Sequence, residues 1–225
     1  FTRNALQLNR GVDENGQLMF SDIASLAGVE STDWSWASLF GDFDNDGFQD
    51  LYVTNGISRR PNDLDYINYI SKDSAQLYLK DSEFVGRMPA GEVPDYFFRN
   101  KGDLTFETMN GSWFTGEPDL SHGAAYGDLD NDGDLDLVIN HLNKEASLFR
   151  NNISDSSHYL RIALKGPEFN TAGIGSKVVV FTAGKQLYRE QFPARGWLSS
   201  VEPVLHFGLG AAMHADSVRV IWPDE

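Results

Sequence analysis

The chain repeats, at an offset of 86 residues, the acidic run Asp42-Phe43-Asp44-Asn45-Asp46-Gly47-Phe48-Gln49-Asp50 as Asp128-Leu129-Asp130-Asn131-Asp132-Gly133-Asp134-Leu135-Asp136. Residues around the two runs keep the same offset, which indicates an internal repeat rather than two unrelated acidic turns. The matching pairs are Gly16 with Gly102, Leu18 with Leu104, Phe20 with Phe106, Ser35 with Ser121 and Gly41 with Gly127.

Each repeat is predicted to be a strand, an acidic loop and a second strand. A stretch of small and aromatic residues leads into each run, and a short apolar stretch with β-branched residues follows it, at residues 51–54 and 137–140. Such short apolar stretches are typical of buried strands. No long amphipathic helix is needed, so the sequence predicts an all-β fold.

The spacing of the aspartates predicts a metal site in each loop. A tight turn can aim the carboxylates at loop positions 1, 3, 5 and 9 at one point, and the glycine at position 6 permits the sharp reversal. Four carboxylates around one point form six repulsive pairs, each costing roughly 4 kcal/mol at about 4 Å and an effective dielectric of about 20. A divalent cation turns this repulsion into attraction. The alternative is a pair of solvated acidic turns.

The ligand types favour calcium over the other metals. The loops offer only hard oxygen ligands, which suit calcium, and less well magnesium or manganese, rather than zinc or copper. A helix–loop–helix calcium loop would place glutamate at position 12, whereas here Val53 and Ile139 occupy that position. Two calcium ions are therefore predicted, with ligands from Asp42, Asp44, Asp46, the Phe48 carbonyl and Asp50, and from Asp128, Asp130, Asp132, the Asp134 carbonyl and Asp136.

The runs and their flanks resemble FG-GAP or VCBS repeats, the blade units of integrin-type β-propellers. The resemblance rests on Phe40-Gly41-Asp42 to Asp50, on Ala124-Ala125-Tyr126-Gly127-Asp128 to Asp136, and on the companion phrases at 96–103 and 148–152. The remainder is similar to the ASPIC/UnbV domain through residues 173–180, Leu205-His206-Phe207-Gly208-Leu209-Gly210 and residues 216–223. The resemblance implies calcium-binding loops between blade strands and an extracellular location.

These resemblances divide the chain into two predicted domains. Residues 1–157 would form propeller blades with an insertion at about 57–95, and residues 158–225 would form a small β-sandwich or barrel-like domain. A propeller closes with about four to eight blades, so two acidic repeats predict only a partial propeller. Because the chain begins at Phe1 and stops just after an expected strand at 217–222, both ends are expected to be truncations.

The insertion and the C-terminal region carry weaker predictions. Short helices are expected at 65–69 and 73–84 in the insertion, which either shapes a ligand site or merely decorates a connection. Five strands are expected in the C-terminal domain, which either binds a partner or caps the last blade. They lie at 159–164, 177–182, 186–192, 204–207 and 217–222.

The composition excludes several functions. Asp and Glu number 33 against 18 Lys and Arg, giving a formal net charge of −15, so the chain is not expected to bind nucleic acid. No apolar run approaches the length of about 20 residues needed to cross a membrane. The absence of cysteine excludes disulfides, thiolate metal sites and thiol nucleophiles.

The predicted function is a secreted or cell-surface, non-enzymatic calcium-binding module that interacts with an unknown protein or glycan. The alternatives are a carbohydrate-active or other enzyme built on a propeller, and a purely structural extracellular domain. Trp34, Trp36, Trp113 and Trp197 either stack on a sugar or pack in the core. His122, six residues before the second loop, is either a neighbour of that metal site or a structural histidine.

Overall fold

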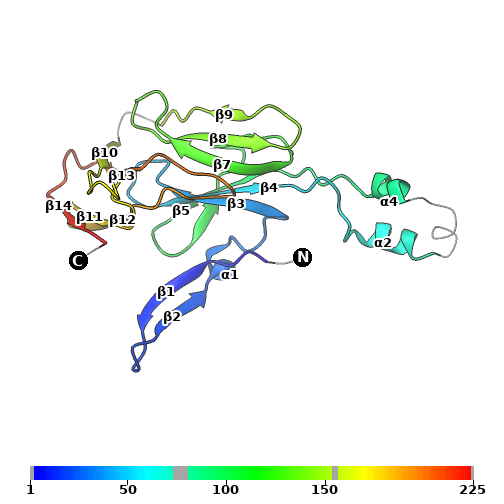
Figure 1. The fold of residues 1–225 in the computed structure, drawn as a ribbon, viewed down its shortest axis with the longest axis horizontal. Coiled ribbons are helices and arrows are strands. Elements are labelled where there is room, and N and C mark those ends of the chain that lie inside the picture. Colours follow the sequence, from blue (N-terminus) through cyan, green and yellow to red (C-terminus); the bar gives the residue numbers. More distant parts are fainter. Residues whose placement is uncertain (1–2, 73–80, 154–156, 224–225) are drawn as a thin grey trace.

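The computed structural model describes residues 3–72, 81–153 and 157–223, and it confirms the all-β prediction. The strands form antiparallel sheets, and none of the sheets in the described part closes into a barrel (Figure 1). Within that part no helix has the length and apolar character needed to cross a membrane.

Two blade-like sheets contain the acidic repeats. The first has the strand order β3 (Ser35–Gly41), β4 (Asp50–Asn55), β5 (Tyr96–Asn100) and β6 (Phe106–Thr108). The second has the order β7 (Ser121–Gly127), β8 (Asp136–His141) and β9 (Ser147–Phe149). The predicted strands at 51–54 and 137–140 lie inside β4 and β8.

The two acidic loops occupy equivalent places in the two sheets. Gly41 pairs with Asp50 across the first loop, and Gly127 pairs with Asp136 across the second. Both strand pairs also shift register at equivalent points, after Ser35 and after Ser121. The aspartate at loop position 9 is therefore the first residue of a strand, and the local structure repeats as the sequence predicted.

A shared core holds the two sheets face to face. Leu39 and Tyr52 of the first sheet are fully buried, and Ile139 of the second is 1% exposed. Their cluster is completed by Ala37, Phe43, Phe97, Phe114, Ala124, Leu135 and Leu137. The sheets stack as neighbouring blades do (Figure 1), so the described chain is a partial, propeller-like arrangement.

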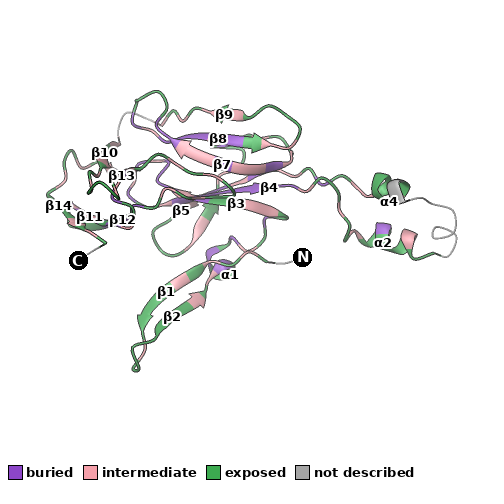
Figure 2. Cartoon of the chain, in the orientation of Figure 1, coloured by how far each residue is buried: buried purple, intermediate pink, exposed green. Residues whose placement is uncertain are grey.

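The N-terminal segment projects from the stacked sheets. The hairpin of β1 (Gln7–Val12) and β2 (Leu18–Asp22) extends away from the body and is mostly exposed (Figure 2). The short helix α1 (Ala24–Ala27) returns the chain to the first sheet, where Ala24 and Ala27 join a second cluster with Leu51, Val53 and Phe98.

The insertion between β4 and β5 carries two short helices on the side of the sheets away from the C-terminal domain (Figure 1). Helix α2 (Leu64–Ile70) contains the predicted helix at 65–69, and Asp63 caps it by accepting a bond of 2.9 Å from the Tyr66 backbone. Of the second predicted helix, residues 73–80 lie outside the described residues and 81–84 belong to α4 (Asp81–Arg87).

The C-terminal domain consists of two small sheets packed against each other. One pairs β10 (His158–Ala163) with β13 (Val204–Gly210), and the other has the order β12 (Lys185–Glu190), β11 (Lys177–Thr182) and β14 (Ser217–Ile221). Their core contains Val178, Val180, Leu187, Leu205 and Phe207. This two-layer arrangement agrees with the predicted small sandwich.

Candidate metal centres in the acidic loops

The two loops adopt the same turn. Asn45 and Asn131 have φ angles of 56° and 63°, and Gly47 and Gly133 have φ angles of 98° and 95°. Asparagine tolerates this left-handed region better than most residues, and glycine enters it without steric cost. Asparagine at position 4 and glycine at position 6 therefore produce the reversal that gathers the aspartates.

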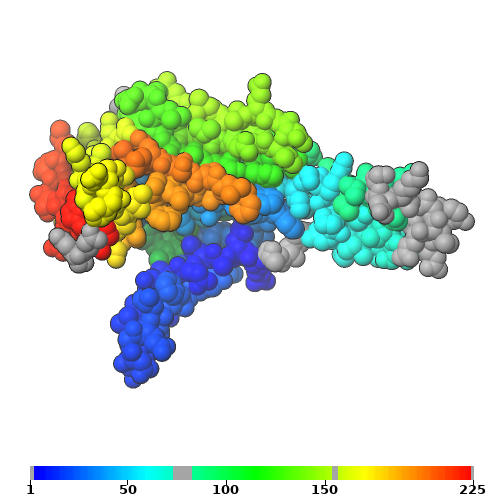
Figure 3. Space-filling view, viewed as in Figure 1, coloured from blue at the N-terminus to red at the C-terminus, as the bar shows by residue number. Residues whose placement is uncertain are grey.

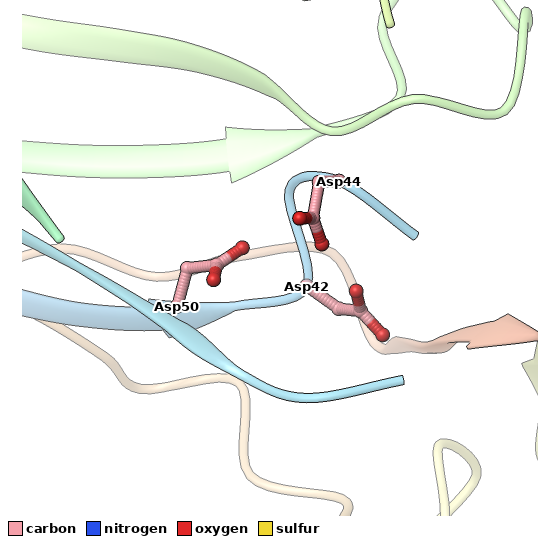
Figure 4. A group of neighbouring side chains, drawn as sticks. All are labelled: Asp42, Asp44 and Asp50. Atoms are coloured by element: carbon pink, nitrogen blue, oxygen red, sulfur yellow. The ribbon is translucent and has the colours of Figure 1, made fainter. Parts of the chain in front are cut away.

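In the first loop, the structure brings together Asp42, Asp44 and Asp50. Each offers a carboxylate oxygen, and these oxygens all lie within 4.8 Å of one another (Figure 4). Asp42 and Asp50 are buried. Asp46, also predicted as a ligand, lies outside this group. Its oxygens contact the Phe48 backbone nitrogen at 2.8 Å and Arg99 Nη2 at 3.5 Å.

In the second loop, the group consists of Asp128, Asp130 and Asp132, again with oxygens within 4.8 Å of one another. Asp128 is buried, whereas Asp130 and Asp132 are exposed. Asp136 lies outside the group. Both its oxygens accept backbone bonds, from Leu129 at 3.0 Å and from Asn151 at 2.8 Å.

The aspartates at position 9 also have a shared structural role. Asp50 accepts bonds from the Phe43 and Asn100 backbone nitrogens at 3.0 and 2.9 Å, the equivalents of the two bonds to Asp136.

Asp134, at position 7 of the second loop, has a different role. It accepts hydrogen bonds from Asn45 Nδ2 at 3.2 Å and from the Ile153 backbone nitrogen at 3.2 Å, so its side chain links the two loops. Ligation by the Phe48 and Asp134 carbonyls stays a prediction.

Each loop is paired with an arginine that follows in the same sheet, a feature not predicted from the sequence. Arg99 Nε lies 2.8 Å from Asp44 Oδ2, and Arg150 Nε lies 2.7 Å from Asp130 Oδ2. Arg150 Nη2 also lies 3.1 Å from Asp132 Oδ2. The sequence feature that could have predicted this pairing is the repeated tripeptide Phe-Arg-Asn at 98–100 and 149–151.

A second arginine reaches each loop from the C-terminal domain. Arg189 Nη2 lies 3.4 Å from Asp42 Oδ2, and Arg161 Nη1 lies 2.9 Å from Asp128 Oδ2. Arg161 also contacts Glu202 at 2.6 Å. No local pattern could have predicted these pairs, because the partners are 147 and 33 residues apart in sequence.

Two buried carboxylate oxygens without hydrogen-bond partners indicate whether a cation would fit the loops. Asp42 Oδ1 and Asp128 Oδ1 are buried and have no hydrogen-bond partner, and their side chains are 0% and 1% exposed. A buried acceptor without a partner costs about 1–3 kcal/mol. Because the same oxygen of position 1 is unpartnered in both loops, the residues present fit a bound cation.

Burial also changes the acidity of the first loop. Desolvation raises the pKa of Asp42 to about 7, although the Arg189 charge opposes the shift. Desolvation likewise raises the pKa of Asp50 to about 8. In the chain alone, the hydrogen bonds to both carboxylates and the Arg189 charge beside Asp42 do not offset the cost of desolvation. The donor set consists of carboxylate oxygens, which suits a hard cation such as calcium.

His122 and the tryptophans lie in packing contacts. The His122 ring lies 4.7 Å from the Trp36 ring, and burial lowers the pKa of His122. The Trp197 ring also packs against Trp36, with the two rings 5.0 Å apart. Trp113 belongs to a different region, where its ring lies 5.6 Å from that of Phe97. These contacts favour the structural interpretation of His122.

The comparisons with known proteins agree with the two-part architecture. Residues 80–139 match the FG-GAP-like repeat, and residues 166–225 match the family described as ASPIC and UnbV. The chain carries an FG-GAP-like repeat followed by an ASPIC and UnbV region. The resemblance predicted from the sequence is thereby confirmed. The FG-GAP-like match includes the second acidic loop, while the first loop is related to it by the internal repeat.

Similar curated proteins are named cartilage acidic protein 1. The protein from Mus musculus is 36% identical over 131 residues, which cover 56% of this chain and 20% of the relative. The protein from Xenopus tropicalis is 31% identical over 232 residues, which cover 97% of this chain and 29% of the relative. The chain therefore spans less than a third of the length of these relatives.

Proposed function

We propose that this FG-GAP-like and ASPIC/UnbV chain is a non-enzymatic, extracellular module that binds one calcium ion in each acidic loop. The observation that carries the proposal is the pair of buried, unpartnered oxygens at Asp42 and Asp128. A cation would supply the missing partner in both loops. The carboxylate ligands and the extracellular supply of calcium support calcium as the ion.

The three-aspartate groups would hold the ions. Asp42, Asp44 and Asp50 would bind the first, and Asp128, Asp130 and Asp132 the second. The ion would supply positive charge to both groups and would coordinate Asp42 Oδ1 and Asp128 Oδ1, which have no hydrogen-bond partner. Asp46 and Asp136, with the Phe48 and Asp134 carbonyls, remain predicted additional ligands.

A secreted or cell-surface location and an interaction role complete the proposal. The curated relatives carry the name cartilage acidic protein 1, and this chain shares the acidic character with a net charge of −15. The blades would present a surface for a protein or glycan partner. Nucleic acid is not a suitable partner because phosphate binding requires an excess of basic residues.

Calorimetric titration with calcium tests the metal sites. The unmodified chain is expected to bind two ions, and Asp44→Ala and Asp130→Ala are each expected to remove one, because each deletes a central carboxylate. Asp65→Ala is the matched control, since Asp65 is an exposed aspartate on α2, outside both loops. Unchanged stoichiometry in either loop variant would exclude that assignment.

A groove beside the loops supports the alternative function, a carbohydrate-active protein. Its volume is about 480 Å³, and its lining includes Phe97, Trp113 and Phe149 together with Asp44 and Arg150. Aromatic rings beside polar groups can accommodate a sugar. Incubation with a glycan panel separates the functions. Retention without turnover supports a binding module, whereas release of products supports an enzyme.

A further inference from the structure

The C-terminal domain packs directly on the acidic loops. Figure 3 shows its orange segment lying across the blade sheets, with the yellow and red segments at the end of the molecule. A Cβ atom on Gly123 of β7 would lie 3.0 Å from the Trp197 carbonyl oxygen of that segment. Because the loops lie at the end of the sheets nearest this domain, the candidate metal sites are part of the contact between domains.

The first loop is held by strand β13 and by Arg189. The Gly208 backbone donates to Asp42 Oδ2 at 2.9 Å, and the Gly210 backbone donates to the Asn45 carbonyl at 2.8 Å. Arg189 donates to the Gly47 carbonyl at 3.3 Å. The C-terminal domain thus contacts loop positions 1, 4 and 6 directly.

Asn45 connects three parts of the molecule. Its Oδ1 lies 2.6 Å from His206 Nε2 of β13, while its Nδ2 donates to the Gly133 carbonyl at 3.3 Å and to Asp134 Oδ1 at 3.2 Å. Asn45 is 1% exposed. The first loop, the second loop and the C-terminal domain therefore share one buried hydrogen-bonded contact.

The second loop meets β10 in a similar way. Arg161 pairs with Asp128 Oδ2 at 2.9 Å, and the Tyr159 ring lies so close to Gly133 that any Cβ atom there would overlap it. Both loops thus offer the C-terminal domain the same features, an aspartate at position 1 and a glycine at position 6.

Packing of the C-terminal domain on the first loop, here called docking, buries Asp42 but provides hydrogen bonds to only one of its two carboxylate oxygens. The bonds from Gly208, Gly47 and Arg189 all go to Oδ2, which leaves Oδ1 buried and without a partner. In an undocked chain water would solvate Oδ1, so docking without a cation incurs a desolvation cost that a bound cation removes.

We propose that docking of the C-terminal domain and calcium binding in the first loop are positively coupled, so that each strengthens the other. The inference rests on the proposed calcium binding. Coupling of this kind is reciprocal, because a ligand that favours the docked state binds that state more tightly. The charge of Arg189 opposes the effect, but it contacts Oδ2 at 3.4 Å, not the unpartnered Oδ1.

Gly208→Ala is the variant that separates docking from ligation. A Cβ atom at Gly208 would overlap backbone atoms of Asn45, and its nearest neighbours all belong to that residue of the opposite domain. No metal-binding side chain is changed. Gly86→Ala is the matched control, since a Cβ atom at Gly86 of α4 meets nothing within 4 Å.

The measurement is calorimetric calcium titration in the full chain carrying Asp130→Ala, so that only the first site is titrated. Gly208→Ala is expected to raise the Kd for calcium about tenfold, within the usual range of coupling, while Gly86→Ala leaves it unchanged. An unchanged or lower Kd in Gly208→Ala overturns the coupling. If the chain with an intact Gly208 binds no calcium, the proposed function fails and the coupling falls with it.

A second variant guards against misfolding of the first. His206→Ala removes a contact with Asn45 instead of adding an obstacle, and it is expected to raise the Kd several-fold in the same direction. Circular dichroism at far-ultraviolet wavelengths checks that each variant keeps its strands. If Gly208→Ala fails to fold, an unchanged Kd in His206→Ala overturns the proposal by itself.

Discussion

At the scale of single residues, the first acidic loop buries two carboxyl groups, whereas aspartates are usually exposed to water. Asp42 is buried with one oxygen partnered and one not, and Asp50 is fully buried with both oxygens bonded to backbone nitrogens. Both carboxyl groups have a raised pKa because of desolvation. The charge state of these residues therefore depends on whether a cation is present.

This state predicts an unusual pH dependence for the metal-free chain. The folded pKa of Asp42 is about 7 and that of Asp50 about 8, both raised from the ordinary value of 3.8. A raised folded pKa contributes stability that is fully present below the unfolded pKa and lost as pH rises through the folded value. With chelator present, the contribution of these two groups to the free energy of unfolding should therefore fall from about pH 4 to about pH 8 and stay level above that.

Urea denaturation at several pH values in chelator and in saturating calcium measures this effect. Calcium is expected to abolish the fall, because the bound ion favours the ionised carboxylates. His206 acts in the opposite direction, because burial lowers its pKa from 6.5 to about 3 and its contribution to stability rises with pH between those two values. The fall caused by the aspartates is therefore measured between about pH 6.5 and about pH 8. Constant stability in chelator across that range would contradict the prediction.

At the scale of secondary-structure elements, the repeat reproduces strands, register and turn together. Loop positions 4 and 6 have the same left-handed conformations in both copies, and the position 9 aspartates accept equivalent backbone bonds. Arg99 near the end of β5 and Arg150 directly after β9 take equivalent places, although the insertion separates Arg99 from its loop. The insertion therefore lengthens a connection without altering the blade geometry.

The contact between the blades predicts which strand positions matter most for stability. Leu39 on β3 is fully buried in the shared core, so Leu39→Ala should lower the free energy of unfolding by about 2–5 kcal/mol. Leu148 on β9 is 65% exposed, so Leu148→Ala should change it by no more than about 0.5 kcal/mol. Denaturant unfolding of both variants checks the difference, and equal effects would contradict the proposed packing of the sheets.

At the scale of the whole molecule, charge is divided between the domains. Residues 1–157 carry 27 acidic and 11 basic residues, a net charge of −16, whereas residues 158–225 carry six acidic and seven basic residues, a net charge of +1. Arg161 and Arg189 of the C-terminal domain meet the first aspartate of each loop. Electrostatic complementarity thus operates between the two parts of the chain.

Calcium should raise the melting temperature of the full chain. At a free calcium concentration about 100 times the Kd, each site adds about 2.7 kcal/mol to the free energy of unfolding. In a chain of this size that corresponds to a rise of roughly 5–10 °C per site. Differential scanning calorimetry in calcium and in chelator measures the shift, and Asp44→Ala should show a smaller rise. Identical melting temperatures in both conditions would count against calcium binding.

The sequence determined the features that depend on neighbouring residues. The spacing of aspartate, asparagine and glycine within each run was sufficient to predict the turn, the strands on either side and a gathering of carboxylates. Apolar stretches also located the five C-terminal strands. These predictions succeeded because backbone conformation in a nine-residue loop is governed by local sterics and hydrogen bonding.

Only the tertiary structure decided which carboxylates meet, which become buried and what contacts them. It grouped Asp42 and Asp44 with Asp50, but Asp128 and Asp130 with Asp132. It also places Arg189 beside Asp42, although the two residues are 147 positions apart in the sequence. Strand β13 packs on Asp42 and donates a backbone hydrogen bond to it. The burial of these carboxylates and their contacts with distant segments depend on how whole sheets pack. The order of residues within a nine-residue loop does not determine that packing.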